Sequence, residues 1–227
     1  MIKYYANFLL VFIMLILSEN LYAQKDVTQF LGIPVDGYKP EMIEKLKSKG
    51  FTINPDTKDV LDGEFNGTDV YIFTGTNNNK VWRISVADVN TMNAGDIKIR
   101  FNNLLQQFQN NKKYLPTPDS TILKLTIPEN EDISYELSVN RKRYQGDFFQ
   151  KTAAYDSLTA EKDILLAKKS LNDTDEKKLA SIILRTYEET IKSFNKSVWF
   201  MISERDGKYY IIIFYENEYN KANGEDL

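Results

Sequence analysis

The chain has 227 residues with 29 basic and 32 acidic side chains, a formal net charge of −3, and neither cysteine nor histidine. The missing residue types exclude Ser-His-Asp and Cys-His relays, imidazole- or thiolate-ligated zinc, thiol redox chemistry and disulfide bonds. No basic excess exists with which to hold a polyanion, and we interpret Arg141-Lys142-Arg143 as a solvated turn or strand end. We therefore expect no nucleic-acid partner.

Residues 1–23 have the pattern of a signal peptide. Lys3 gives a positive start, residues 8–17 form an unbroken apolar run, and Leu21-Tyr22-Ala23 offers a cleavage site. The apolar run is shorter than the roughly 20 residues that a membrane-spanning helix needs. Gln24 stands where a lipid-accepting cysteine would be required. We expect a periplasmic or secreted protein with no stable membrane anchor after signal cleavage, still carrying the formal net charge of −3 because Lys3 and Glu19 are lost together.

Residues 24–227 are expected to form a single α+β domain in which amphipathic helices pack on antiparallel β-meanders. An apolar lead-in over 27–37 precedes a helix over 40–49, with Pro40 in its first turn and Gly50 at its end. Residues 51–89 show strand-like runs separated by turn residues. One of these turns, Asn66-Gly67, is a strong hairpin signal.

The second part of the chain follows the same order of helix and then strands. Asp96 is predicted to cap a helix with an apolar stripe formed by Ile97, Phe101, Leu104, Leu105 and Phe108. The runs 122–127, 133–139 and 144–149 are interpreted as strands. Residues 152–195 predict a helical hairpin, inserted before a C-terminal β-hairpin over 198–203 and 208–215 that turns at Asp206-Gly207.

This order indicates a duplicated helix-plus-strands unit, with halves at 27–90 and 95–227. The two tryptophans of the chain both follow a valine in a strand-like run, in Val81-Trp82 and in Val198-Trp199. One shared dipeptide leaves open whether the halves are true repeats. In either case, each amphipathic helix needs a sheet face to cover.

Aromatic side chains are the candidates for a binding surface. The chain has 14 Tyr, 13 Phe and 2 Trp, and Tyr and Trp are favoured where one end of a side chain is apolar and the other wet. Only alternate residues of a strand face one side, so we expect part of the C-terminal aromatic row to lie in the core. The candidate binding residues are Trp82, Trp199, Tyr209, Tyr215 and Tyr219.

Two kinds of enzyme remain compatible with the composition. A pair of carboxylates can hydrolyse glycosides, and a serine with a buried lysine can act as nucleophile and base. Ser193 and Lys196 have the spacing for the second kind, but they lie at a predicted helix end and are treated as a chance match. The carboxylates considered for the first kind are Asp59, Asp62, Glu64, Glu216, Glu218, Glu225 and Asp226. No catalytic residue is assigned.

No metal or cofactor is expected. The oxygen-rich run 172–176 (Asn-Asp-Thr-Asp-Glu) lacks the central glycine and the final glutamate of an EF-hand calcium loop. We interpret it as a helix cap. Residues 76–80 are likewise interpreted as a hairpin tip.

Four segments together resemble an uncharacterised family of short signal-peptide-bearing exported proteins of Gram-negative gut anaerobes. They are Phe30-Leu31-Gly32-Ile33-Pro34-Val35-Asp36-Gly37, residues 42–51, Val81-Trp82-Arg83-Ile84 and residues 219–227. The element order is also distantly similar to β-lactamase-inhibitor-like and PepSY-like domains, which favours binding by analogy alone. These motifs are structural, so the resemblance carries over no catalytic or binding residue.

We therefore expect a non-enzymatic exported binding module that uses a sheet face or its loops to hold a protein or envelope component. The alternative is a carboxylate-dependent hydrolase acting on envelope or dietary glycans. Two facing carboxylates in a cleft, one with a raised pKa, would favour the hydrolase. A broad exposed aromatic patch would favour binding. No oligomeric state is predicted.

Overall fold

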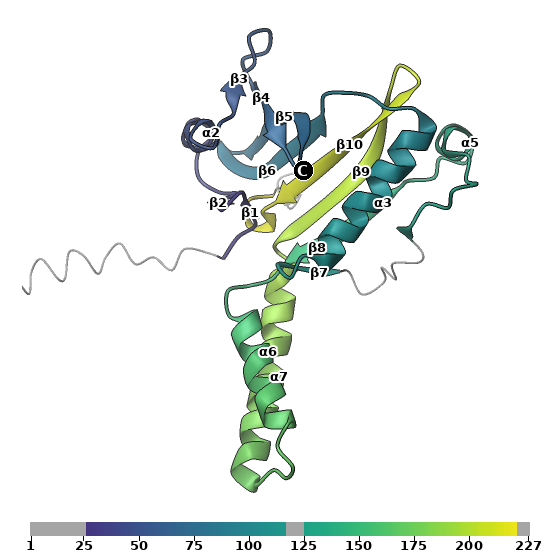
Figure 1. The fold of residues 1–227 in the computed structure, drawn as a ribbon. Helices are drawn as coiled ribbons and strands as arrows, with labels where there is room; N and C mark the ends of the chain where they lie inside the picture. The colour runs from purple at the N-terminus through teal and green to yellow at the C-terminus, as the bar shows by residue number, and fades with distance from the viewer. Residues whose placement is uncertain (1–25, 117–124, 222–227) are drawn as a thin grey trace, which may run out of the picture.

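The computed structural model describes residues 26–116 and 125–221, and it places one large antiparallel sheet at the centre of the fold (Figure 1). The sheet has eight strands in the order β3-β4-β5-β6-β10-β9-β8-β7. Their bounds are β3 Thr52–Ile53, β4 Val60–Phe65, β5 Thr68–Asn77, β6 Lys80–Asp88, β7 Tyr114–Pro116, β8 Gln145–Gln150, β9 Ser197–Arg205 and β10 Lys208–Glu216. A separate pair, β1 Gln29–Phe30 and β2 Ile33–Pro34, precedes it.

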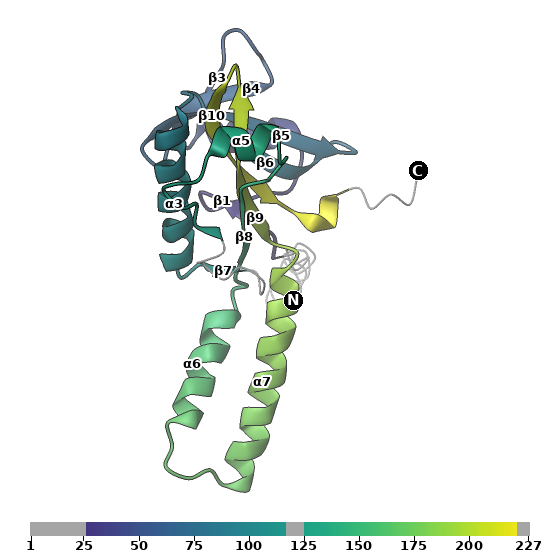
Figure 2. The same ribbon diagram turned by 90° about the vertical axis from the view of Figure 1, so that its right-hand side faces the viewer.

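The helices cover one face of this sheet or extend beyond it. The bounds of the covering helices are α2 Lys39–Lys47, α3 Ala94–Asn110 and α5 Ile133–Ser138. The helices α6 (Tyr155–Leu166) and α7 (Asp173–Ser193) form a hairpin that extends away from the end of the sheet (Figure 2), and the short helix η1 (Glu218–Asn220) follows β10. The fold is α+β, with the predicted helical insertion before the last β-hairpin. Within the described ranges, no helix is long and apolar enough to cross a membrane.

The predicted hairpin turns are confirmed by their backbone conformation. Asn66 and Gly67 join β4 to β5 with φ of 54° and 71°, and Asp206 and Gly207 join β9 to β10 with φ of 55° and 72°. Positive φ at both central residues matches the right-handed twist of the flanking strands, and it is tolerated best by Asn, Asp and Gly. These short turns fix the register of both hairpins.

The helix predicted from the stripe at 97–108 begins earlier than expected. Asn93, rather than Asp96, caps α3: its side-chain oxygen accepts hydrogen bonds from the backbone N–H groups of Gly95 at 2.8 Å and Asp96 at 2.9 Å. Asp96 lies in the first turn, where a negative charge suits the positive end of the helix dipole. The predicted stripe itself is correct, because all five of its residues are buried.

The predicted strand over 133–139 is wrong, because this segment is helix α5. The side chain of Asp132 accepts a hydrogen bond from the backbone N–H of Tyr135 and caps the helix, and Ile133 is its one buried residue. Of the predicted strand 122–127, residues 122–124 lie outside the described residues and 125–127 form no strand. The predicted strand over 144–149 corresponds to β8.

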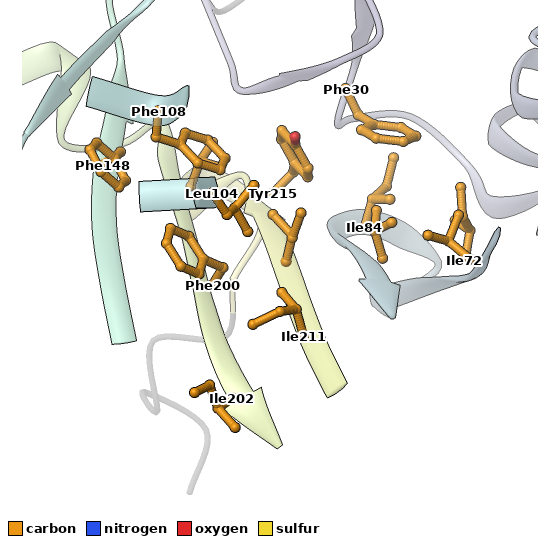
Figure 3. Packing of buried hydrophobic residues seen from close by; sticks show 14 of the residues in the cluster. Phe30, Ile72, Ile84, Leu104, Phe108, Phe148, Phe200, Ile202, Ile211 and Tyr215 are labelled. Atoms are coloured by element: carbon orange, nitrogen blue, oxygen red, sulfur yellow. The ribbon is translucent and has the colours of Figure 1, made fainter. Parts of the chain in front are cut away.

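The core occupies the sheet face under α2, α3 and α5 and has two adjoining parts (Figure 3). Under α3, the Phe108 ring stacks on those of Phe148 and Phe200, with ring centroids 5.0 and 5.5 Å apart. In the other part, Phe30 packs near Ile72 and Ile84. Tyr215 of β10 lies between the two parts, with its ring centroid 5.0 Å from that of Phe30.

A buried ion pair connects α3 to the middle of the sheet. The guanidinium of Arg100 donates to both carboxylate oxygens of Asp88, at 2.9 and 3.2 Å, and Asp88 is 3% exposed. Asp88 also accepts from the backbone N–H of Ile211 at 3.3 Å. This contact joins β6, β10 and α3 at one point.

In both halves of the chain a helix precedes four sheet strands, and the second half also contains α5 and the α6–α7 hairpin between its strands. α2 precedes β3–β6, α3 precedes β7–β10, and the last strands of the two sets, β6 and β10, pair antiparallel in the middle of the sheet. Trp82 lies on β6 but Trp199 lies on β9. The shared Val-Trp dipeptide therefore does not mark equivalent positions in the two halves.

The close contact between β8 and the core predicts a large effect of Gly146→Ala. A Cβ at Gly146 would lie 2.7 Å from two ring atoms of Phe200, a fully buried side chain that has no room to move. We expect the free energy of unfolding, measured with urea, to fall by about 1–3 kcal/mol.

Gly75→Ala is the matched control, because a Cβ there meets its nearest heavy atom at an ordinary 3.4 Å. We expect a change within about 0.5 kcal/mol for this variant. In a Phe200→Leu background, the loss caused by Gly146→Ala should shrink by about 1 kcal/mol. If the losses in unfolding free energy caused by Gly146→Ala and Phe200→Leu were strictly additive, the Phe200 ring would not be the group that a Cβ at position 146 displaces.

Candidate functional site

The sheet face opposite the helices carries two rows of side chains that cross the central strands. Register places Tyr71, Ala87, Ile212 and Met201 side by side in one row, and Phe73, Ser85, Phe214 and Trp199 in the other. Within the described residues, no α-helix packs on this face: α2, α3 and α5 bury their apolar residues on the opposite side, and the α6–α7 hairpin extends away (Figures 1 and 2). The short helix η1 contacts β6 at one end of the face, beside Trp82. We call this surface the open face and define it as Tyr71, Phe73, Trp82, Arg83, Ser85, Trp199, Met201, Tyr210, Ile212 and Phe214.

Arg83 lies at the centre of an aromatic cluster on the open face. Its guanidinium carbon is 4.1 Å from the ring centroid of Trp82 and 4.9 Å from that of Phe214. The Phe214 ring in turn stacks on Trp199, with centroids 4.0 Å apart. A guanidinium over aromatic faces is attracted by their electron density, so this cation orients the surrounding rings.

The buried carboxylate of Glu216 holds Arg83 in that position. Glu216 is 3% exposed, forms an ion pair with Arg83, and accepts a hydrogen bond from Trp199 Nε1 at 2.9 Å. Lys221 Nζ lies 3.6 Å from its other oxygen. Burial alone would raise the pKa of Glu216, but the Trp199 hydrogen bond and the charge of Arg83 outweigh burial and hold that pKa below its usual value.

Glu218 lies next to Glu216 and has the opposite pKa shift. Burial, together with the hydrogen-bonded neighbour Glu216, raises the pKa of Glu218 although Lys221 opposes the change. Two nearby carboxylates whose pKa values move apart form the pattern that acid-base hydrolysis uses. Here Oε1 of Glu216 already accepts hydrogen bonds from both Trp199 and Arg83, which commits that oxygen to the protein.

The other carboxylates considered from the sequence do not join this pair. Asp59 forms an exposed ion pair with Lys39 at 2.7 Å, and Asp62 accepts two hydrogen bonds from Asn54 at 2.9 and 3.0 Å. Glu64 is exposed on β4. Residues 225 and 226 lie outside the described residues.

Of the five candidate binding residues, the structure brings Trp82 and Trp199 together around Arg83. Tyr209 is 5% exposed and its hydroxyl is hydrogen-bonded to Ser134 Oγ at 2.8 Å, so it lies in the core. Tyr215 is 4% exposed and also belongs to the core, where it lines a cleft. Tyr219 is 43% exposed in η1 and accepts a hydrogen bond from Asn195 Nδ2.

Of the residues of the open face, the five candidates predicted from the sequence include Trp82 and Trp199 alone. Tyr210, Ile212 and Phe214 alternate with the core residues of β10, and this alternation is visible in the sequence. Tyr71 and Phe73 show the same alternation in β5. What the sequence does not show is that β5, β6, β10 and β9 are neighbours, because β6 and β10 are more than 100 residues apart. The surface of the open face has a hollow of about 290 Å³ over these strands. The residues that line it include Tyr71, Phe73, Tyr210, Phe214 and Arg205.

The apolar side chains along α7 and at its C-terminal end are divided between two surfaces. Leu179 and Ile182 pack toward α6 with Leu158 and Leu165, whereas the others are exposed. The exposed members include Ile183, Tyr187, Ile191 and Phe194, at 42–63%. The α6–α7 hairpin therefore has its own small core and an uncovered apolar side.

The remaining motifs have structural roles. The side chain of Asn172 caps α7 by accepting from the backbone N–H of Asp175 at 2.8 Å, as the cap interpretation predicts. Ser193 donates to the carbonyl of Glu189, and Lys196 pairs with Asp26, so the two are engaged elsewhere. In the part of the chain that the structure describes, no group of three or more acidic side chains is placed to hold a metal ion.

Comparisons with known proteins found no match: none of the protein-family models, curated proteins or solved structures that were searched matches this chain. The geometry of the open face and its neighbourhood is therefore what supports a functional proposal.

The Glu216 ion pair predicts a pH-dependent effect of Arg83→Met. The lowered pKa of Glu216 means that this pair stabilises the fold above the unfolded-state pKa and loses its contribution as pH falls through the folded-state pKa. Removing Arg83 leaves a buried carboxylate with weaker partners. We expect a loss of about 2–4 kcal/mol in urea unfolding at about pH 7. The loss should be smaller at about pH 4, because without Arg83 the buried carboxyl group can be neutralised by protonation.

Arg205→Met is the control for that substitution. Arg205 also lies over an aromatic ring, 5.3 Å from the centroid of Tyr210, but it is exposed and forms no ion pair with a described residue. Its replacement should cost less than about 1 kcal/mol at both pH values. An equal loss for Arg83→Met at both pH values would contradict the assigned role of Glu216.

Proposed function

We propose that this chain is an exported, non-enzymatic binding module that holds a partner protein on its open face. The observation that carries the proposal is the pair of aromatic and apolar rows crossing β5, β6, β10 and β9 on the sheet face that no described α-helix covers. Contiguous apolar surface of this kind is rare on a monomer unless it binds something.

The composition of the open face supports a protein partner. The centres of protein interfaces are enriched in Tyr, Trp, Phe, Met and Arg and depleted in Lys, Glu, Asp and Ser. The open face contains all five enriched types, and its rings are already ordered by packing on Arg83 and on each other. Such pre-ordered rings lose little conformational freedom on binding.

The shape of the open face also favours a protein over a small molecule. Its hollow of about 290 Å³ lies at the small end of ligand pockets, whereas the rows extend across several strands. Arg205 borders this hollow without an ion-pair partner among the described residues. We therefore infer that the partner presents an apolar surface with an acidic side chain near the Arg205 end.

The proposed compartment is the periplasm or the cell exterior. It rests on the signal-peptide pattern of residues 1–23, which lie outside the described residues. A cysteine-free chain suits an oxidising compartment, because no stray thiol can be oxidised there.

A carboxylate-dependent hydrolase acting on glycans is the second candidate, and the opposed pKa shifts of Glu216 and Glu218 are the observation that favours it. It is the weaker candidate because Glu216 is buried and bonded to Trp199 and Arg83. A hydrolase would lose all activity on envelope glycans in a Glu218→Gln variant. The binding module would show no such activity in either form.

Phe73→Asp tests the binding function. Phe73 is 41% exposed at the edge of the open-face rows, so a charge there disturbs an interface more than it disturbs the fold. We expect the purified chain to recover a specific partner from an envelope extract. The same partner, once purified, should bind Phe73→Asp at least about tenfold more weakly, measured by surface plasmon resonance.

Ile164→Asp on α6 is the matched control, because Ile164 is 67% exposed but lies far from the open face on the α6–α7 hairpin (Figure 1). This variant should retain the partner. Three results would count against the proposal: recovery of no partner, equal loss in both variants, or a self-association in sedimentation that Phe73→Asp abolishes. The last result would assign the open face to a second copy of the chain.

A further inference from the structure

A second concave region lies on the helix side of the sheet, away from the open face. A cleft of about 570 Å³ lies there between α3 and the segments that carry Leu31, Phe51 and Phe65. Strand β10 forms the floor through Ile213 and Tyr215. The apolar lining consists of Leu31, Phe51, Phe65, Leu104, Phe108 and Ile213. This lining is continuous with the core, so the cleft presents an ordered apolar wall to whatever enters it.

Hydrogen-bonded hydroxyl groups line one end of the cleft. Tyr114 is hydrogen-bonded to Tyr215 and to Gln150, and Gln150 is held in place by two hydrogen bonds to the backbone of Gln29, each 2.7 Å long. Burial raises the pKa of both tyrosines, so both hydroxyls stay neutral at physiological pH. The two neutral hydroxyl groups can form hydrogen bonds with a ligand, and they do not repel an anionic group.

A polar hollow of about 440 Å³ adjoins the cleft at these two tyrosines and shares Tyr114 and Tyr215 with it. Its charged lining consists of three lysines and two aspartates: Lys113, Lys151, Lys196, Asp26 and Asp156. Lys196 pairs with Asp26 at 2.5 Å and Lys151 with Asp156 at 2.9 Å. Lys113 forms no ion pair with a described residue, which leaves the hollow with one uncompensated positive charge.

We propose that the cleft and the polar hollow together bind a small amphiphile with a single apolar body and an anionic head group. The apolar body would lie in the cleft against Phe51, Phe108 and Ile213. The head group would pass the two tyrosine hydroxyls and reach Lys113 in the hollow. The volume of the cleft falls within the range of small-molecule sites. Its lining combines the apolar wall with polar side chains, among which Lys49 and Glu64 carry opposite charges, so the uncompensated charge of the combined site is that of Lys113.

The mouth of the cleft is defined by a side-chain bridge. Asn66, in the β4–β5 turn, donates a hydrogen bond to Gln107 of α3 at 2.8 Å. Both side chains are exposed and line the cleft. A bulky side chain at position 107 would therefore obstruct entry without changing the buried packing of α3.

Three probes with the same ten-carbon body and different head groups test the proposed chemistry: decanoate, decanol and decyltrimethylammonium. Each is titrated calorimetrically into the exported chain below its micelle concentration. We expect decanoate to bind saturably with one molecule per chain, decanol to bind more weakly, and decyltrimethylammonium to bind weakest. Absence of saturable decanoate binding, or equal binding of the cationic probe, would overturn the proposal.

Two pairs of variants locate the site. Gln107→Trp should weaken decanoate binding at least about tenfold, whereas Gln106→Trp, one position along the exposed side of α3, should leave it within about twofold. Lys113→Glu should weaken it about fivefold to tenfold, whereas Lys112→Glu should not, because Lys112 does not line the hollow. Equal effects within either pair would place the amphiphile elsewhere.

This site is independent of the proposed partner-binding function. Phe73→Asp on the open face should bind decanoate as the unsubstituted chain does, and Gln107→Trp should retain the partner protein. Loss of decanoate binding in Phe73→Asp would show that the probe binds the aromatic rows of the open face and would overturn the assignment to the cleft.

Discussion

Strand β10 lies in the middle of the sheet, and its side chains must alternate between the two faces. Ile211, Ile213 and Tyr215 therefore enter the core under α3, while Tyr210, Ile212 and Phe214 lie on the opposite side. The α-helices of the described chain cover only one face, so the apolar side chains of the other face stay at the surface. Packing on one side fixes the register, and that register in turn sets the spacing of the aromatic rows on the other.

Two ion pairs with buried carboxylates stabilise the central strands of the sheet. Asp88 and Arg100 join α3 to β6 and β10, and Glu216 holds Arg83 among the rings of the open face. Each pair is fixed by further hydrogen bonds, which compensates for the cost of removing the charges from water. The cleft lies beside α3, where Leu104 and Phe108 face Phe51 and Phe65 across Ile213 and Tyr215 of β10.

Much of the fold follows from local signals in the sequence. Asn66-Gly67 and Asp206-Gly207 specify their hairpins, and the spacing of Ile97 to Phe108 specifies the buried side of α3. The prediction failed where a short side-chain cap decides the outcome: Asp132 starts a helix in a segment whose apolar residues alternate like those of a strand. It also failed for the candidate site, because pairing of β6 with β10 joins segments distant in sequence. Trp82 and Trp199 were identified individually, but Arg83, which brings them together, was not.

The central claim is that one sheet face is covered by helices while the other is free to bind. Hydroxyl-radical footprinting read by mass spectrometry tests it most directly, since it reports the solvent contact of individual aromatic side chains in the folded chain. The account predicts oxidation at Phe73 and Tyr210 and protection at Phe148 and Phe200. Protection of Phe73 and Tyr210 in the purified monomer would show that another part of the chain covers the open face, and would contradict the account.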